Sequence, residues 1–116
     1  MVNRDNVLDT RPKAALYSTY GTKRDKRAAD FLYAFCVVNG LRCTLYVDKC
    51  IPKDGQVPGW TRLCDDVSAG KYDVVLTWLS APGMAQFCAE HNARFEQIDV
   101  FDWHAATREK KFNILR

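Results

Sequence analysis

Residues 69–79 read Ala-Gly-Lys-Tyr-Asp-Val-Val-Leu-Thr-Trp-Leu, and this stretch decides which fold the sequence predicts. Its second half, 74–79, is a continuous β-prone run, which is typical of a strand that is covered on both faces. The apolar residues before it recur at intervals of three and four, as on one face of a helix: Trp60, Leu63, Cys64 and Val67. A buried strand that follows an amphipathic helix indicates a parallel sheet with helices packed on it.

The same alternation of strand and helix extends along the chain in both directions. Strands are expected at 14–20, 41–48, 74–79 and 95–101, and helices between Thr22 and Gly40, over 60–70 and over 84–91. Thr22 followed by Asp25 predicts a capping box at the start of the first helix. The expected fold is α/β: a single doubly wound, three-layer domain with a mainly parallel sheet of four to five strands, the first strand lying inside the sheet.

The second expected strand, 41–48, alternates between apolar and polar residues. We expect its apolar positions to point toward the core and the others to form a wetter face, as near a sheet edge. The apolar positions are Leu41, Cys43, Leu45 and Val47, and the others are Arg42, Thr44, Tyr46 and Asp48.

Composition limits the class of protein to which the chain can belong. Residues 1–12 are expected to be a flexible lead, 13–101 the domain, and 102–116 a basic and partly helical tail. No apolar run approaches the ~20 residues that span a bilayer, so a cytoplasmic location without membrane contact is expected. The five cysteines are odd in number and scattered, which favours reduced thiols over a disulfide scaffold.

The charge is unevenly distributed along the chain. Residues 1–27 hold seven Lys or Arg and three Asp, whereas residues 28–103 hold six Lys or Arg and ten Asp or Glu. Residues 104–116 hold four Lys or Arg and one Glu. Basic ends around an acidic body suggest a polyanion near the termini, and a solvated charged face is the alternative.

A ligand of an open parallel sheet binds at the carboxyl ends of its strands. The loops expected there predict a crevice for a ligand or anion, formed by Tyr20, Gly21, Thr22, Lys23, Asp48 and Ser80, with Thr19, Lys49, Lys53 and Asp54 nearby. The segment 21–24 could hold an anion at a helix start, or it could be only a turn and a cap. Cys88 and His91 share a helix face, but two ligands do not close a metal site, so neither a metal nor a cofactor is expected.

Several segments, in the right order, carry a family resemblance over residues 13–101. Residues 16–22 (Leu-Tyr-Ser-Thr-Tyr-Gly-Thr) stand in the place of an opening Tyr-Ala-Arg-Val-Ser-Thr strand, and Asn39-Gly40 in that of the next helix end. Residues 46–48 and 58–63 (Pro-Gly-Trp-Thr-Arg-Leu) look like the Asp-x-x-Ser-Gly…Arg-Pro-Gly-Leu segment. Residues 69–79 are the most similar piece. The chain thus resembles the catalytic domain of the serine recombinases (resolvases and invertases), which implies a resolvase-like fold; a flavodoxin-like ancestry would give the same strand order.

The departures from that family concern its catalytic residues. Gly21 stands at the position of the nucleophilic serine, Thr19 at that of the strand arginine, and Val57 at that of the arginine before Pro-Gly. Residues 80–84 (Ser-Ala-Pro-Gly-Met) replace the family's Asp-Arg-Leu-Gly-Arg. Phosphoseryl transfer needs a hydroxyl nucleophile and guanidinium groups on the phosphate. The resemblance therefore implies a non-catalytic domain, although the question of an enzyme stays open.

Such a domain would act by binding. The partners implied are a second copy of the chain, an active recombinase or another partner in DNA transactions, or DNA itself, bound weakly. The expected DNA contacts are Lys23, Arg24, Lys26 and Arg27, together with the tail residues Arg108, Lys110, Lys111 and Arg116. Two alternatives remain: a small α/β enzyme or binding protein that takes a nucleotide or other small anion in the crevice, and a structural interaction protein of a phage or mobile element.

Overall fold

The elements of the chain alternate as the sequence predicts. A computed structural model describes residues 10–50 and 53–101. In chain order the elements are β1 (Lys13–Tyr20), α1 (Lys23–Val38), β2 (Arg42–Lys49), the short 3₁₀ helix η2 (Lys53–Gly55), α2 (Pro58–Ser68), β3 (Val74–Thr77), α3 (Met84–Glu90) and β4 (Arg94–Gln97). The predicted lead up to residue 9 and the predicted tail from residue 102 lie outside the described residues.

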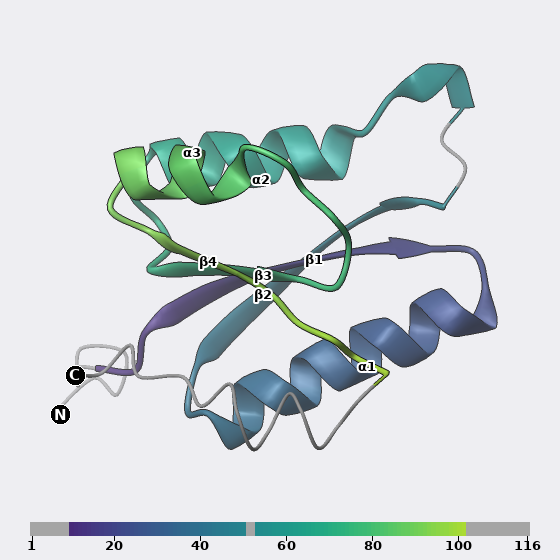
Figure 1. Cartoon of the computed structure of the whole chain (residues 1–116), viewed down its shortest axis with the longest axis horizontal. Helices are drawn as coiled ribbons and strands as arrows, with labels where there is room; N and C mark the ends of the chain where they lie inside the picture. Colours follow the sequence, from purple (N-terminus) through teal and green to yellow (C-terminus); the bar gives the residue numbers. More distant parts are fainter. Residues whose placement is uncertain (1–9, 51–52, 102–116) are drawn as a thin grey trace, which may run out of the picture.

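The four strands form one sheet in the order β2-β1-β3-β4, and all three neighbouring pairs are parallel. The expected fold class and the interior place of the first strand are therefore confirmed. Figure 1 shows α1 on one face of the sheet and α2 with α3 on the other, which gives three layers. The chain moves from β1 to one side of the sheet and then crosses back to the other, so the strand order reverses between β1 and β3. That reversal is the point where doubly wound sheets bind ligands.

Two apolar clusters, one on each face, hold the layers together. The α1 face is packed by Leu16, Leu32 and Phe35 with their neighbours, and the opposite face by Tyr17, Leu63 and Val75 with theirs. The predicted stripe of α2 is confirmed, because Leu63 and Val67 are fully buried while Trp60 is half-buried. In the described residues no helix is long and apolar enough to cross a membrane.

The prediction for the faces of β2 is wrong in its second half. Leu45 and Val47 are 47% and 39% exposed, whereas Tyr46 and Asp48 are 7% and 3% exposed. The reason is that β2 is an edge strand, and α2 packs against it more closely than α1 does. Tyr46 is accommodated in that packing by polar partners, since its hydroxyl donates to Asp66 Oδ2 over 2.5 Å.

The last strand is shorter than predicted. The sheet pairing of β4 ends at Gln97, although strand was expected to Phe101. Beyond it Ile98 still donates its N–H to Thr77 O over 2.8 Å, and Ile98 and Val100 are buried in the α1-face cluster. The apolar residues that predicted a longer strand thus serve the core without continuing the ladder.

Candidate functional site

A cavity of about 350 Å³ opens at the carboxyl ends of β1 and β3, where the strand order reverses. Its apolar walls come from the start of α2 and from the loop after β3: Val57, Trp60, Leu79, Ala81 and Pro82. Its polar lining residues all carry a hydroxyl group: Tyr17, Thr19, Thr77 and Ser80. We call this cavity the strand-end crevice. None of these lining residues is a Lys, Arg, His, Asp or Glu, so among described residues the lining carries no formal charge.

Asp48 fixes one wall of the strand-end crevice from behind. Its Oδ2 accepts hydrogen bonds from the Tyr17 hydroxyl over 2.6 Å and from the backbone N–H of Trp60 over 2.8 Å. Its Oδ1 accepts from the Gly59 N–H over 2.8 Å. A carboxylate at a helix start satisfies N–H groups that have no partner within the helix. Asp48 is therefore committed to the N-terminus of α2 and is not free to bind a ligand.

The aromatic pair in front of that carboxylate is held in one geometry. The rings of Tyr17 and Trp60 meet edge to face, with centroids 4.7 Å apart and an interplanar angle of 72°. Burial, followed by the hydrogen bond to Asp48, raises the pKa of the Tyr17 phenol above its ordinary range. Tyr17 thus remains a neutral hydrogen-bond donor at physiological pH.

Gly59 is what allows α2 to approach β2 so closely. A Cβ added there would lie 2.9 Å from the Val47 carbonyl carbon, and nearer still to its oxygen. It would also lie 3.1 Å from Asp48 Oδ1. Only glycine fits this close approach of two backbones, which in turn brings the N–H groups of α2 to Asp48.

The β1–α1 turn uses a second buried carboxylate in the same way. Asp25 is 2% exposed and accepts hydrogen bonds from the Thr19 and Thr22 hydroxyls, over 2.6 and 2.8 Å, and from the Thr22 N–H over 3.1 Å. The predicted capping box is confirmed. Burial raises the pKa of Asp25, but the hydrogen bonds from Thr19 and Thr22 outweigh it, so the pKa lies below its ordinary value.

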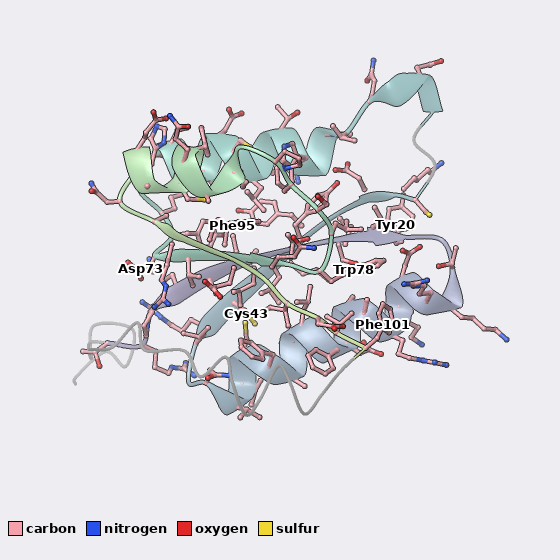
Figure 2. The ribbon with its side chains drawn as sticks, in the orientation of Figure 1. Tyr20, Cys43, Asp73, Trp78, Phe95 and Phe101 are labelled. Carbon is pink, nitrogen blue, oxygen red and sulfur yellow. The ribbon has the colours of Figure 1, made fainter. Side chains whose placement is uncertain are left out.

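The predicted DNA-binding cations lie at the start of α1. The side chains of Lys23, Lys26 and Arg27 are exposed there. Arg24 is exposed as well, and its guanidinium also contacts aromatic rings, lying 4.5 Å from the centroid of the Phe101 ring and 5.8 Å from that of Trp78. Figure 2 shows Trp78 and Phe101 side by side next to α1, and their rings meet edge to face at 5.8 Å.

The structure brings only part of the predicted crevice together. Of the six predicted residues, Ser80 lines the strand-end crevice and Asp48 supports it from behind. The other four run from the last residue of β1 to the first residue of α1 and are exposed: Tyr20, Gly21, Thr22 and Lys23.

Seven lining residues were not predicted as site residues: Tyr17, Val57, Trp60, Thr77, Leu79, Ala81 and Pro82. Tyr17 and Thr77 carried a usable signal, since each lies in a strand that was predicted to end at this edge. Trp60 carried none, because its spacing is that of a core position on an amphipathic helix.

The hydroxyl groups near the end of β1 are occupied by the fold. Ser18 is fully buried, donates to the Thr19 carbonyl over 2.8 Å and accepts from Trp78 Nε1 over 3.0 Å. Gly21 has φ +126°, a conformation that residues with a side chain rarely adopt. A serine at position 21 would therefore be strained in this backbone.

Cys88 and His91, the pair that raised the question of a metal, have ordinary structural surroundings in the core and at the end of α3. Cys88 is fully buried, and burial raises the pKa of its thiol to about 11. His91 Nδ1 lies 2.9 Å from the Phe87 carbonyl oxygen. Over residues 10–50 and 53–101, no group of three or more His, Cys, Asp or Glu side chains is placed to hold a metal ion.

Comparison with known proteins supports the fold alone. No protein-family model matches the sequence, and no curated protein sequence matches it significantly. Among solved structures, the chain is similar to the C-terminal catalytic domain of ISC1926 TnpA, an IS607-like serine recombinase. The TM-score is 0.60 at 16% identity, over 73% of this chain and 69% of that one. The chain therefore has the three-layer α/β fold of a serine recombinase catalytic domain.

Proposed function

We propose that this chain is a serine-recombinase-like domain that acts by binding and does not itself cut DNA. The observation that carries the proposal is the uncharged lining of the strand-end crevice. A recombinase-type transfer develops charge on a phosphate, and that charge must be stabilised by guanidinium groups held against it. No cationic side chain lines the crevice among described residues; Lys49 at the end of β2 and the cations at the start of α1 are near the strand ends but do not line it.

The missing nucleophile supports the same conclusion. Serine attack needs a hydroxyl that is exposed and is paired with a base. Gly21 offers none, Ser18 is buried between two hydrogen bonds, and the Thr19 hydroxyl donates to Asp25. Ser80 is exposed, but the described residues that line its crevice include no His, Lys or carboxylate to activate it.

The surface supports a binding role. Exposed cations gather on the first turn of α1, where the positive end of the helix dipole adds to their field. The edge strand β2 exposes two apolar side chains, Leu45 and Val47. The partners proposed are a second copy of this chain, an active recombinase, and DNA bound weakly through its phosphates.

A cleavage assay tests the catalytic half of this proposal. The native chain is incubated with supercoiled plasmid, and both nicking and covalent protein–DNA adducts are measured. Neither is expected. Gly21→Ser is the matched variant, and it too is expected to be inactive, since a side chain at position 21 would be strained by the backbone conformation. A covalent adduct with the native chain would overturn the proposal.

Association measurements test the binding half. Sedimentation of the chain alone, with an active serine recombinase, and with a DNA duplex at low salt separates the three partners. In at least one of these three samples the chain is expected to form a complex, so that its weight-average mass rises with concentration. If all three mixtures sediment as their separate components, the binding role is wrong.

A further inference from the structure

We propose that the strand-end crevice is a binding site for an uncharged planar ring, such as an indole or a purine base. This site is independent of the function proposed above, since it can be occupied whether or not the chain binds DNA or another protein. The inference rests on the position of the crevice, the rigidity of its walls and the uncharged side chains of its described lining residues.

The size and position of the crevice are those of a ligand site. Its volume of about 350 Å³ falls within the range of small-molecule pockets, which is roughly 300–1,000 Å³. It lies where the strand order reverses, between the carboxyl ends of β1 and β3. Two strand ends and the start of a helix therefore contribute to one opening, without any rearrangement of the chain.

The walls of the crevice are fixed before any ligand arrives. The Tyr17 hydroxyl and the backbone N–H of Trp60 donate to the same oxygen of Asp48, and the Trp60 ring packs edge to face against the Tyr17 ring. Thr77 is fixed at the base of the crevice, because its hydroxyl donates to the Tyr17 carbonyl over 2.9 Å and accepts from the Leu79 N–H over 3.2 Å. A preformed site loses little binding free energy in ordering its own side chains.

The chemistry of the lining selects the ligand. The apolar surfaces of Trp60, Leu79 and Pro82 favour a planar apolar body, since aromatic rings gain from stacking and from edge contacts. The Ser80 hydroxyl is exposed and can exchange a hydrogen bond with a polar atom on the rim of such a ring. The Thr19 hydroxyl already donates to Asp25, so toward the crevice it can only accept.

The lack of charge argues against a phosphate or carboxylate occupant. An anion leaving water for this crevice would lose its hydration and meet no cation among the described lining residues, which is strongly unfavourable. The carboxylate of Asp48 lies just behind the aromatic wall and adds to that penalty. An uncharged ring incurs neither.

The test uses three probes: indole, adenosine and adenosine monophosphate. Each is titrated to millimolar concentration into the isotopically labelled chain, and amide chemical shifts are followed. Indole or adenosine is expected to bind saturably, with the largest shifts at Thr19, Leu79 and Ser80. The monophosphate is expected to bind no tighter than adenosine, because its added charge finds no partner.

Ala81→Leu is the variant that fills the crevice, and Ala89→Leu is its matched control. Ala81 lines the crevice, whereas Ala89 is exposed on α3 away from it. The first change is expected to weaken indole or adenosine binding at least tenfold, and the second to leave it unchanged. The inference is overturned by no saturable binding of either neutral probe, by shifts centred elsewhere or insensitive to Ala81→Leu, or by a monophosphate that binds tenfold tighter than adenosine.

Discussion

The strand-end crevice and the first turn of α1 are both built on residues at the end of β1, yet they have opposite characters. The crevice is lined by Trp60 of α2 and by the loop after β3, and its described lining carries no charge. The start of α1, which lies on the other face of the sheet from α2 (Figure 1), holds four cations: Lys23, Arg24, Lys26 and Arg27. The difference arises because the chain leaves β1 toward the α1 face. Whatever residues follow Tyr20 are therefore carried away from the crevice.

In both regions one buried carboxylate accepts hydrogen bonds from N–H groups at the start of a helix. Asp48 accepts hydrogen bonds from N–H groups that begin α2, and Asp25 accepts one from the N–H of the residue that caps α1. Because each carboxylate accepts hydrogen bonds from the helix start that it caps, neither is available to bind a ligand. The described lining of the crevice then holds no cation, whereas exposed cations lie at the start of α1, and this difference separates a neutral crevice from a basic surface.

The largest effect is expected where the crevice loses its supporting carboxylate. Asp48→Ala leaves two buried N–H groups and the Tyr17 hydroxyl without an acceptor, and each unsatisfied donor costs about 1–3 kcal/mol. The free energy of unfolding, measured by chemical denaturation, is expected to fall by about 3 kcal/mol or more. Asp65→Ala, an exposed acid on α2, is the control and should change stability by less than about 0.5 kcal/mol. Equal effects would mean that Asp48 does not support the crevice.

A smaller effect is expected from closing the space between α2 and β2. Gly59→Ala forces a Cβ against the Val47 carbonyl, and overpacking of this kind costs about 1–3 kcal/mol. Because the same movement pulls the N–H groups of α2 away from Asp48, the two changes should not add. The double variant Asp48→Ala with Gly59→Ala is expected to be more stable than the sum of the two single effects predicts. Strict additivity would show that the close approach and the hydrogen bonds are independent.

The order of strands and helices could be predicted from the sequence, because each element shows the hydrophobic periodicity of its type. The β-prone run 74–79 and the stripe around Leu63 identify a buried strand and a helix that packs on it. The inverted faces of β2 could not be predicted this way, because Tyr46 and Asp48 are buried through partners far along the chain: Asp66, Tyr72 and the N–H groups of α2.

The site was only partly predictable for a related reason. Topology correctly points to the carboxyl ends of the strands, and Ser80 does line the crevice. The polar residues that follow β1 were assigned to the same place because polarity was the signal. The wall that the structure reveals is aromatic, and Trp60 in the sequence was indistinguishable from one more core residue of an amphipathic helix.

The carboxylate of Asp25, at the start of α1, should make the free energy of unfolding depend on pH. The pKa of Asp25 is lowered in the folded chain, so its contribution is complete above the ordinary value of 3.8 and disappears as the pH falls through the folded pKa. Asp25→Asn is expected to lower the free energy of unfolding by about 1–2 kcal/mol at pH 7, in line with other helix caps. That difference should shrink below about pH 3.8, as the native carboxylate becomes protonated as well.

Asp30→Asn is the matched control for that pH dependence, since Asp30 is an exposed acid on the same helix. Its denaturation curve should follow that of the native chain at every pH. A gap between native and Asp25→Asn that stays constant from about pH 7 to well below the ordinary carboxyl pKa would show that the capping interaction does not depend on the charge of Asp25.

The smallest effect on stability, and the sharpest contrast with the crevice, is expected at the cations of α1. Lys23, Lys26 and Arg27 are exposed, so changing all three to Ala should alter the free energy of unfolding by less than about 0.5 kcal/mol per site. Arg24 is kept, because its guanidinium lies over Phe101 and removing it would disturb packing. Binding of a DNA duplex should instead fall clearly, and the slope of log affinity against log salt should become shallower by about 0.9 for each phosphate that is no longer neutralised.

The control for that variant removes the same charge away from the start of α1, with Lys13, Arg62 and Lys71 changed to Ala. If the α1 cations bind the DNA, this control keeps most of the native affinity at two salt concentrations, because field strength falls off within about 8–10 Å at moderate salt. If both triple variants weaken binding equally, net charge alone governs it and no local surface exists. Undetectable binding of the native chain at low salt would make the α1 cations a solvated face, leaving the neutral crevice as the region of this end of the sheet that is built to receive a ligand.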